Sequence, residues 1–204
     1  MYSLDPKEIS EKKTYGYLTS AIAPRPIALA STVDENGNPN LAPFSFFNVF
    51  SANPPILILS PVLNVDGSQK HTLENAIATK EIVINVVDYN ITQKTSDASF
   101  SFEKGVSEFD EVGFTKLASD IVKPFRVKES PVHFECKVKE VVHLGYGSIA
   151  GNLIICEVIK MHFSETVLDD KSRIDQTKID LVARAGGDYY TRMKDGFFKV
   201  ERPK

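Results

Sequence analysis

The amino-acid sequence predicts a mainly β fold, an all-β barrel with a few short accessory helices. Apolar runs of strand length recur along the chain, and turn residues separate them. The 11 prolines are scattered among these runs, as in barrels whose short strands are joined by many turns. The first runs cover residues 27–33, 41–50, 55–60 and 82–87.

The first two runs are predicted to pair with each other. The link between them reads DENGNPN, and its Asn36–Gly37 pair tolerates the positive φ of a tight turn. We therefore expect residues 27–50 to form one hairpin.

The second half of the chain predicts another strand pair. In residues 132–138, VHFECKV, apolar and polar side chains alternate, which is the period of a half-buried strand. Residues 152–163 are its expected partner. The segment GYGSIAGN between them holds three glycines and suits either a plain loop or a close approach to a ligand.

Helices are expected to be few. Residues 71–80 place Leu73, Ala76 and Ile77 on one helical face, and residues 6–18 are a weaker candidate. At 204 residues, the length fits a single domain over residues 1–204.

Composition narrows the function classes. The net charge of −3 comes without a clustered basic surface, so we expect no nucleic-acid partner. The sequence lacks a signal peptide and a bilayer-length apolar run, so we expect a cytoplasmic protein without a membrane partner. Cys136 and Cys156 read as buried free thiols, and no histidine or cysteine spacing indicates a metal site.

One segment could hold an anion. Lys70, His71 and Thr72 stand at a probable helix start, where free N–H groups and the positive helix end favour negative charge. Thr72 could cap the helix or offer its hydroxyl to a ligand. The alternative is a solvated lysine beside an ordinary first turn.

Two further segments carry polar groups among rigid or flat apolar ones. Ser45 and Asn48 interrupt a phenylalanine-rich strand, which suits a flavin ring, although they could equally face solvent or a turn. Arg25 lies between Pro24 and Pro26. Its guanidinium could contact phosphate or ribityl oxygens, or it could be a surface charge.

Several segments in fixed order, APRPIALAST, NGNPNLAPFSFFNVFSANPP, ILSP, KHTLENA and VKESPVHFEC, resemble the flavin reductase-like, FMN-binding split-barrel family that includes the flavoredoxins. The resemblance covers roughly residues 14–200. It implies an FMN-binding split β-barrel that forms a homodimer with FMN near the subunit interface. It also implies hydride transfer from NADH or NADPH to FMN.

The resemblance assigns site residues by position. Ser45, Phe46, Phe47 and Asn48 would border the flavin ring, Ser31 and Ser60 would contribute from neighbouring strands, and Lys70, His71 and Thr72 would hold the phosphate with Arg25 on the same side. In the late motif ARAGGDYY, it leaves open whether Arg184, Gly186, Gly187 and Tyr189 cover the ring or shape the nicotinamide pocket.

The chain departs from the family pattern at one point. After Ser60–Pro61 near relatives often carry arginines, whereas this sequence has Val62, Leu63 and Asn64. The departure predicts weaker phosphate affinity.

The implied mechanism requires no side chain to exchange protons with the substrate, so no catalytic residue is assigned. Two alternatives stay open: a flavoredoxin-type electron carrier with bound FMN and a protein donor, and a non-enzymatic flavin-binding module. Pyridoxamine phosphate oxidases match the motifs less well. The sequence leaves open the choice of NADH or NADPH, the final acceptor, which could be a protein electron acceptor, and whether FMN stays bound between turnovers.

Overall fold

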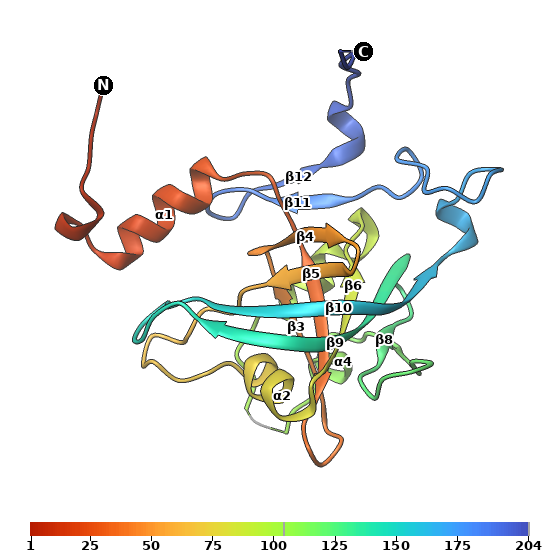
Figure 1. Ribbon diagram of the computed structural model, residues 1–204, viewed down its shortest axis with the longest axis horizontal. Coiled ribbons are helices and arrows are strands. Elements are labelled where there is room, and N and C mark those ends of the chain that lie inside the picture. Colours follow the sequence, from red (N-terminus) through yellow and green to blue (C-terminus); the bar gives the residue numbers. More distant parts are fainter. Residues whose placement is uncertain (104, 204) are drawn as a thin grey trace.

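The computed structural model describes residues 1–103 and 105–203 and is built around a seven-stranded antiparallel sheet (Figure 1). In spatial order its strands are β3 (Pro39–Phe44), β2 (Ala28–Val33), β6 (Glu81–Val86), β9 (Val132–His143), β10 (Asn152–Phe163), β5 (Pro55–Leu59) and β4 (Phe47–Ala52). The prediction of a mainly β fold is therefore confirmed.

Smaller elements surround this sheet. Two further sheets are formed by β1 (Arg25–Pro26), β11 (Val182–Arg184) and β12 (Tyr190–Arg192), and by β7 (Lys116–Leu117) and β8 (Arg126–Val127). The helices are α1 (Glu11–Ala21), α2 (His71–Thr79), α3 (Thr92–Asp97) and α4 (Glu108–Glu111), with 3₁₀ turns η1 (Pro6–Glu8), η2 (Tyr89–Ile91), η3 (Glu165–Val167) and η4 (Met193–Gly196). Among the described residues, no helix is both long and apolar enough to cross a bilayer.

The core consists of apolar clusters on both faces of the sheet. The largest cluster takes side chains from β2, β3, β5, β6, β9 and β10, as expected inside a barrel, and Leu73 and Ala76 of α2 pack into it. Leu29 and Leu41 belong to a second cluster with Phe109. Because β2 is buried on both faces, its sequence reads as a continuous apolar run.

Both cysteines lie in the barrel interior. Cys136 and Cys156 are free and fully buried, as predicted. Burial raises the pKa of the Cys156 thiol to about 12, so this side chain packs as a small apolar group.

The predicted hairpin over residues 27–50 is confirmed as far as Phe44 and is wrong for residues 45–50. β2 pairs with β3 as far as Phe44, and Gly37 takes a φ of +87° in the connecting turn. The strand then breaks at Ser45 and Phe46, and β4 pairs with β5 instead of continuing along β2. Because of the break, the apolar run forms both outer strands of the sheet, β3 and β4.

The predicted strand over residues 132–138 and its pairing with residues 152–163 are confirmed, and Lys137 is exposed as expected. The expected exposure of His133 and Glu135 is wrong, because the segment around residues 120–122 covers this part of the polar face. His133 is 7% exposed and Glu135 is fully buried. The Glu135 carboxylate accepts hydrogen bonds from the backbone N–H groups of residues 120, 121 and 122 at 2.8, 2.8 and 3.1 Å, and from His162 Nε2 at 2.7 Å. Burial raises the pKa of this carboxyl, but the hydrogen bonds outweigh it and lower the pKa to about 2.

Asp120, Glu135 and His162 offer ligand atoms within 4.8 Å of one another. The Glu135 oxygens already accept the hydrogen bonds above, and Arg126 and Lys160 lie 3.4 and 3.5 Å from the Asp120 carboxylate. These contacts account for the cluster as an anchor that holds the covering segment on β9.

We expect Glu135→Gln to lower the free energy of unfolding by about 2–3 kcal/mol at pH 7, because it removes charge-assisted bonds from a buried site. The folded-state pKa lies below the unfolded value, so this stabilisation is present above about pH 4.5 and is lost as the pH falls toward 2. Urea unfolding between pH 7 and 3 measures both effects. Glu140→Gln, at an exposed position of β9, is the control. Equal acid sensitivity in Glu135→Gln and the unaltered protein would contradict this account.

Candidate functional site

A continuous line of hollows runs along the surface from the β3–β4 break to the start of α2. An apolar hollow of about 490 Å³ lies at the break. A middle hollow of about 300 Å³ shares Ser45, Phe46 and Ser60 with it. The middle hollow also shares Ala42 and Lys70 with a polar hollow at the start of α2. The three form one extended surface that changes from apolar to polar.

Arg25 organises the apolar end of this surface. It is only 8% exposed, and its guanidinium donates to the carbonyl groups of Thr19, of Ile22 at 2.6 Å and of Ala185 at 3.2 Å. Its Nε lies 3.4 Å from Ser45 Oγ. Burial lowers the pKa of Arg25, and the three carbonyl groups compensate the buried charge. The resemblance assigned Arg25 to the phosphate side, but Arg25 lines the apolar hollow and shares none of these hollows with Lys70.

The structure brings the predicted ring-binding residues together. Five of them line the apolar hollow: Ser45, Phe46, Phe47, Asn48 and Ser60. The backbone N–H of Ser60 donates to the Phe46 carbonyl at 2.8 Å, which fixes β5 against the break. A side chain at Gly151 would approach Ser60 Oγ to 3.1 Å, so this glycine of the β9–β10 connection permits close packing.

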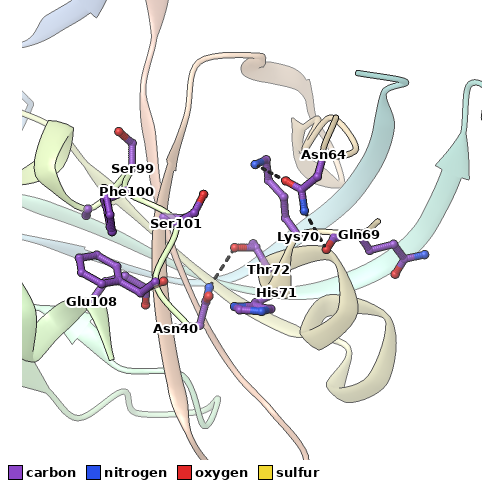
Figure 2. A pocket seen from close by; sticks show the side chains of 13 residues that line it. Asn40, Asn64, Gln69, Lys70, His71, Thr72, Ser99, Phe100, Ser101 and Glu108 are labelled. Carbon is purple, nitrogen blue, oxygen red and sulfur yellow. Dashed lines mark hydrogen bonds between the residues drawn. The ribbon is translucent and has the colours of Figure 1, made fainter. Parts of the chain in front are cut away.

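The predicted phosphate-binding residues also lie together, at the start of α2 (Figure 2). Lys70 is the residue before the helix, and its Nζ donates to Asn64 Oδ1 at 3.0 Å. No side chain caps the helix. The buried Thr72 hydroxyl accepts from Asn40 Nδ2 at 2.9 Å instead. The first-turn N–H groups therefore have no side-chain acceptor in the cap position.

The departure from the family pattern falls at this same end. Val62 lines the middle hollow beside Lys70, and Asn64 holds the Lys70 ammonium. Over the residues that the structure describes, Lys70 is the only lysine or arginine that lines the middle and polar hollows. A phosphate here would meet one lysine and the helix N-terminus.

Ser31 does not join the site. It is fully buried, its hydroxyl has no hydrogen-bond partner, and it lines none of the described hollows. Side chains alternate along a strand, so Ser31 shares the face of Leu29 rather than that of Ala30. Ser31 therefore lies apart from the other predicted ring-binding residues.

Sequence reasoning missed two buried polar residues of the polar hollow. Glu108 of α4 is 6% exposed and lines the hollow with Lys70 and His71. Burial raises its pKa, while a hydrogen bond from the Leu41 backbone N–H at 2.8 Å and the charge of His71 act in the opposite direction. Asn40 of β3 is the other. Glu108 lies outside the segments that carry the resemblance, and Asn40 lies within one of them without a pattern that indicates its role.

The ARAGGDYY segment forms the turn between β11 and β12, against α1. A side chain at Gly186 would come within 2.9 Å of the Ser20 Cα, and Gly187 takes a φ of +58°. Arg184 stacks on Tyr190 with 4.5 Å to the ring centroid, and both line a further hollow of about 330 Å³ beside Ser45. Tyr189 is 78% exposed and lines none of these hollows, so Tyr190 is the tyrosine of this segment that lies near the site.

The chain belongs to the flavin reductase-like family, because the profile of the flavin reductase like domain matches residues 20–178. An uncharacterised protein of Aquifex aeolicus is 34% identical over 186 residues, which is 91% of this chain and 93% of that protein. The family match gives the general class of protein, and two solved structures resemble the chain over nearly its whole length.

The nitrilotriacetate monooxygenase component B of Bacillus cereus is 30% identical with a TM-score of 0.91, and 98% of each chain is covered. A split-barrel domain protein of Shewanella frigidimarina is 24% identical with a TM-score of 0.83 over the whole of both chains. The second likeness shows the shared fold. The predicted split β-barrel is confirmed.

We expect Arg25→Lys to lower the free energy of unfolding by about 2–4 kcal/mol, because an ammonium cannot replace all the bonds of the planar guanidinium and leaves buried carbonyl groups unpaired. Amide hydrogen exchange should accelerate at the C-terminal end of α1 and in residues 185–189. Chemical denaturation and exchange mass spectrometry measure these effects.

The matched control is Arg173→Lys, since Arg173 is largely exposed and pairs with Asp169 at 2.8 Å. If Arg25→Lys behaves like this control, Arg25 does not hold α1 and β11 in place.

Proposed function

We propose that this protein binds FMN along the line of hollows and transfers a hydride from NADH or NADPH to it. The observation that carries the proposal is the polarity of the surface, with aromatic side chains at one end and Lys70 with the α2 N-terminus at the other. FMN has the same polarity, with a flat ring system at one end and a phosphate at the other.

Each end of the proposed site has a distinct role. Phe46 and Phe47 provide an apolar wall for the ring, and Ser45 and Ser60 offer hydroxyl groups to its polar edge. Lys70 and the first-turn N–H groups of α2 bind the phosphate. This division predicts that ring binding and phosphate binding can be weakened separately.

FMN supplies the hydride-accepting chemistry when bound, and the chain supplies placement. Pro43 and Ser45 line both the middle hollow and the hollow beside Arg184, which could admit the nicotinamide nucleotide next to the flavin. The guanidinium of Arg184 would then lie close to the negatively charged phosphates of the nicotinamide nucleotide. No side chain is assigned a proton transfer, and we propose no catalytic residue.

A homodimer is part of the proposal. β4 is the last strand of the large sheet, and Val49 and Phe50 are 64% and 63% exposed on it. Leu18 and Ile22 of the neighbouring α1 end are also exposed, and with Phe50 they line the apolar hollow. A second copy that covers this apolar region would also shield the flavin ring from water.

The proposed function also includes a protein partner that accepts electrons from the reduced flavin. The relative from Bacillus cereus is named as one component of a monooxygenase, which supports a protein that serves an electron-accepting partner. The flavoredoxin-type carrier and the non-enzymatic flavin-binding module would use the same site. The carrier would take electrons from a protein donor, and the module would take none.

We expect the purified protein with added FMN to show flavin absorption bands that bleach rapidly when NADH or NADPH is added without oxygen. Stopped-flow absorption measures the rate and identifies the preferred donor. Bands that persist with both nucleotides would favour the carrier or the flavin-binding module. A protein that does not bind FMN would contradict the proposal.

We expect Lys70→Ala to weaken FMN binding by about 10-fold to 100-fold, or about 1.5–3 kcal/mol, because it removes a charge-assisted hydrogen bond to phosphate. Riboflavin has no phosphate, so its affinity should barely change. Fluorescence titration with both flavins measures the difference.

Lys128→Ala is the control, since Lys128 is exposed and lines none of the hollows. Equal weakening of FMN and riboflavin by Lys70→Ala would place Lys70 away from the phosphate.

A further inference from the structure

Glu108 is a buried carboxylate in the hollow proposed for the phosphate. Its Oε2 accepts from the Leu41 backbone N–H at 2.8 Å, on the edge of β3 that has no neighbouring strand. In Figure 2, Glu108 lies on one side of the hollow and Lys70 on the other, with Asn40, His71 and Thr72 between them. A phosphate bound at Lys70 would share this hollow of about 160 Å³ with the carboxylate.

Among the described residues, few charged side chains lie near Glu108. β3, on which α4 packs, has no ionisable side chain, and α2 contributes His71 and Lys70. Residues 98–102 on the rim are alanine, serine and phenylalanine. On α4 itself, Asp110 and Glu111 are exposed, and Asp110 pairs with Lys116 at 2.7 Å. Over residues 1–103 and 105–203, Lys70 is therefore the only lysine or arginine that lines the hollow.

One lysine cannot balance two nearby anions. A phosphate monoester carries a charge of about −1.5 to −2 at pH 7, and an ionised Glu108 adds another. Like charges that lie close together favour uptake of a proton by one of the groups, and the burial of Glu108 limits how far water can screen the repulsion. Glu108 is already disposed to hold a proton, because burial disfavours its charged form.

We propose that Glu108 takes up a proton when the phosphate of FMN enters the hollow, so that phosphate recognition is coupled to proton uptake. This inference rests on the proposed function. The neutral carboxyl group removes the repulsion and gains an O–H that can donate to an acceptor. Glu108 would thus set the pH range in which FMN is retained.

The sign of the pH dependence follows from this coupling. If binding takes up one proton, FMN affinity falls as the pH rises, by at most about 10-fold per pH unit. Riboflavin brings no phosphate, so its affinity should not follow this trend. Measurements between pH 6.5 and 8.5 largely avoid protonation of the phosphate itself.

Isothermal titration calorimetry of the full chain with FMN, at pH 7 in Pipes and in Tris, tests the proposal, because the two buffers differ in heat of ionisation. The dependence of the binding heat on the buffer gives the number of protons taken up. We expect net uptake with FMN and none with riboflavin. Glu108→Gln keeps an oxygen for the Leu41 N–H and should abolish most of the uptake, with FMN binding retained and less dependent on pH.

His71→Asn is the matched control, because His71 is the other titratable group that acts on Glu108. It should leave most of the proton uptake in place. No uptake with FMN, equal uptake with riboflavin, or unchanged uptake in Glu108→Gln would overturn the role of Glu108. If Glu108→Gln does not fold, the ratio of FMN to riboflavin affinity across pH in the unaltered protein decides, and a constant ratio overturns the proposal. Failure to bind either flavin would instead refute the proposed function.

Discussion

The guanidinium of Arg25 joins three parts of the chain that are distant in sequence. It donates to carbonyl groups at the end of α1 and after β11, and it reaches Ser45 at the break between β3 and β4. Figure 1 shows α1 and the β11–β12 pair beside the large sheet near β4. The end of α1, Arg25 itself and the β3–β4 break line the apolar hollow, whereas the β11–β12 segment lines the hollow beside Arg184. The relative position of the two hollows therefore depends on this one buried cation.

The close contact between Gly186 and Ser20 strengthens the same junction. Because glycine has no side chain, the turn after β11 can lie directly against α1. Arg25 then reaches the Ala185 carbonyl from the other side of the turn. Rigid packing of this kind suits a site whose proposed task is to hold a flat ring at a fixed angle to a second reactant.

Sequence reasoning predicted the strands well, because apolar runs and alternation report burial directly. It failed where packing against another part of the chain decided which side chains are buried or where a strand ends. His133 and Glu135 on the polar face of β9 are buried because residues 120–122 fold back onto Glu135, whereas Lys137 stays exposed. The strand from 41 to 50 breaks where β5 offers a new partner. Both faces of β2 are buried and each carries one hydroxyl side chain, so nothing in the sequence could place Ser31 on the face away from the hollows.

The candidate site shows the same pattern. Lys70, His71 and Thr72 are neighbours in sequence, so the helix start alone predicted their grouping. Glu108 and Asn40 enter the polar hollow through tertiary packing, and no local pattern marks them. For Arg25 the sequence left open a held guanidinium or a surface charge, because its partners are backbone carbonyl groups that a sequence does not display as acceptors.

A crystal structure of the protein with FMN would test the central claim most directly. The account predicts the ring against Phe46 and Phe47 in the apolar hollow and the phosphate within hydrogen-bond distance of Lys70 and the first turn of α2. A phosphate bound beside Arg184, or a ring outside the apolar hollow, would contradict it.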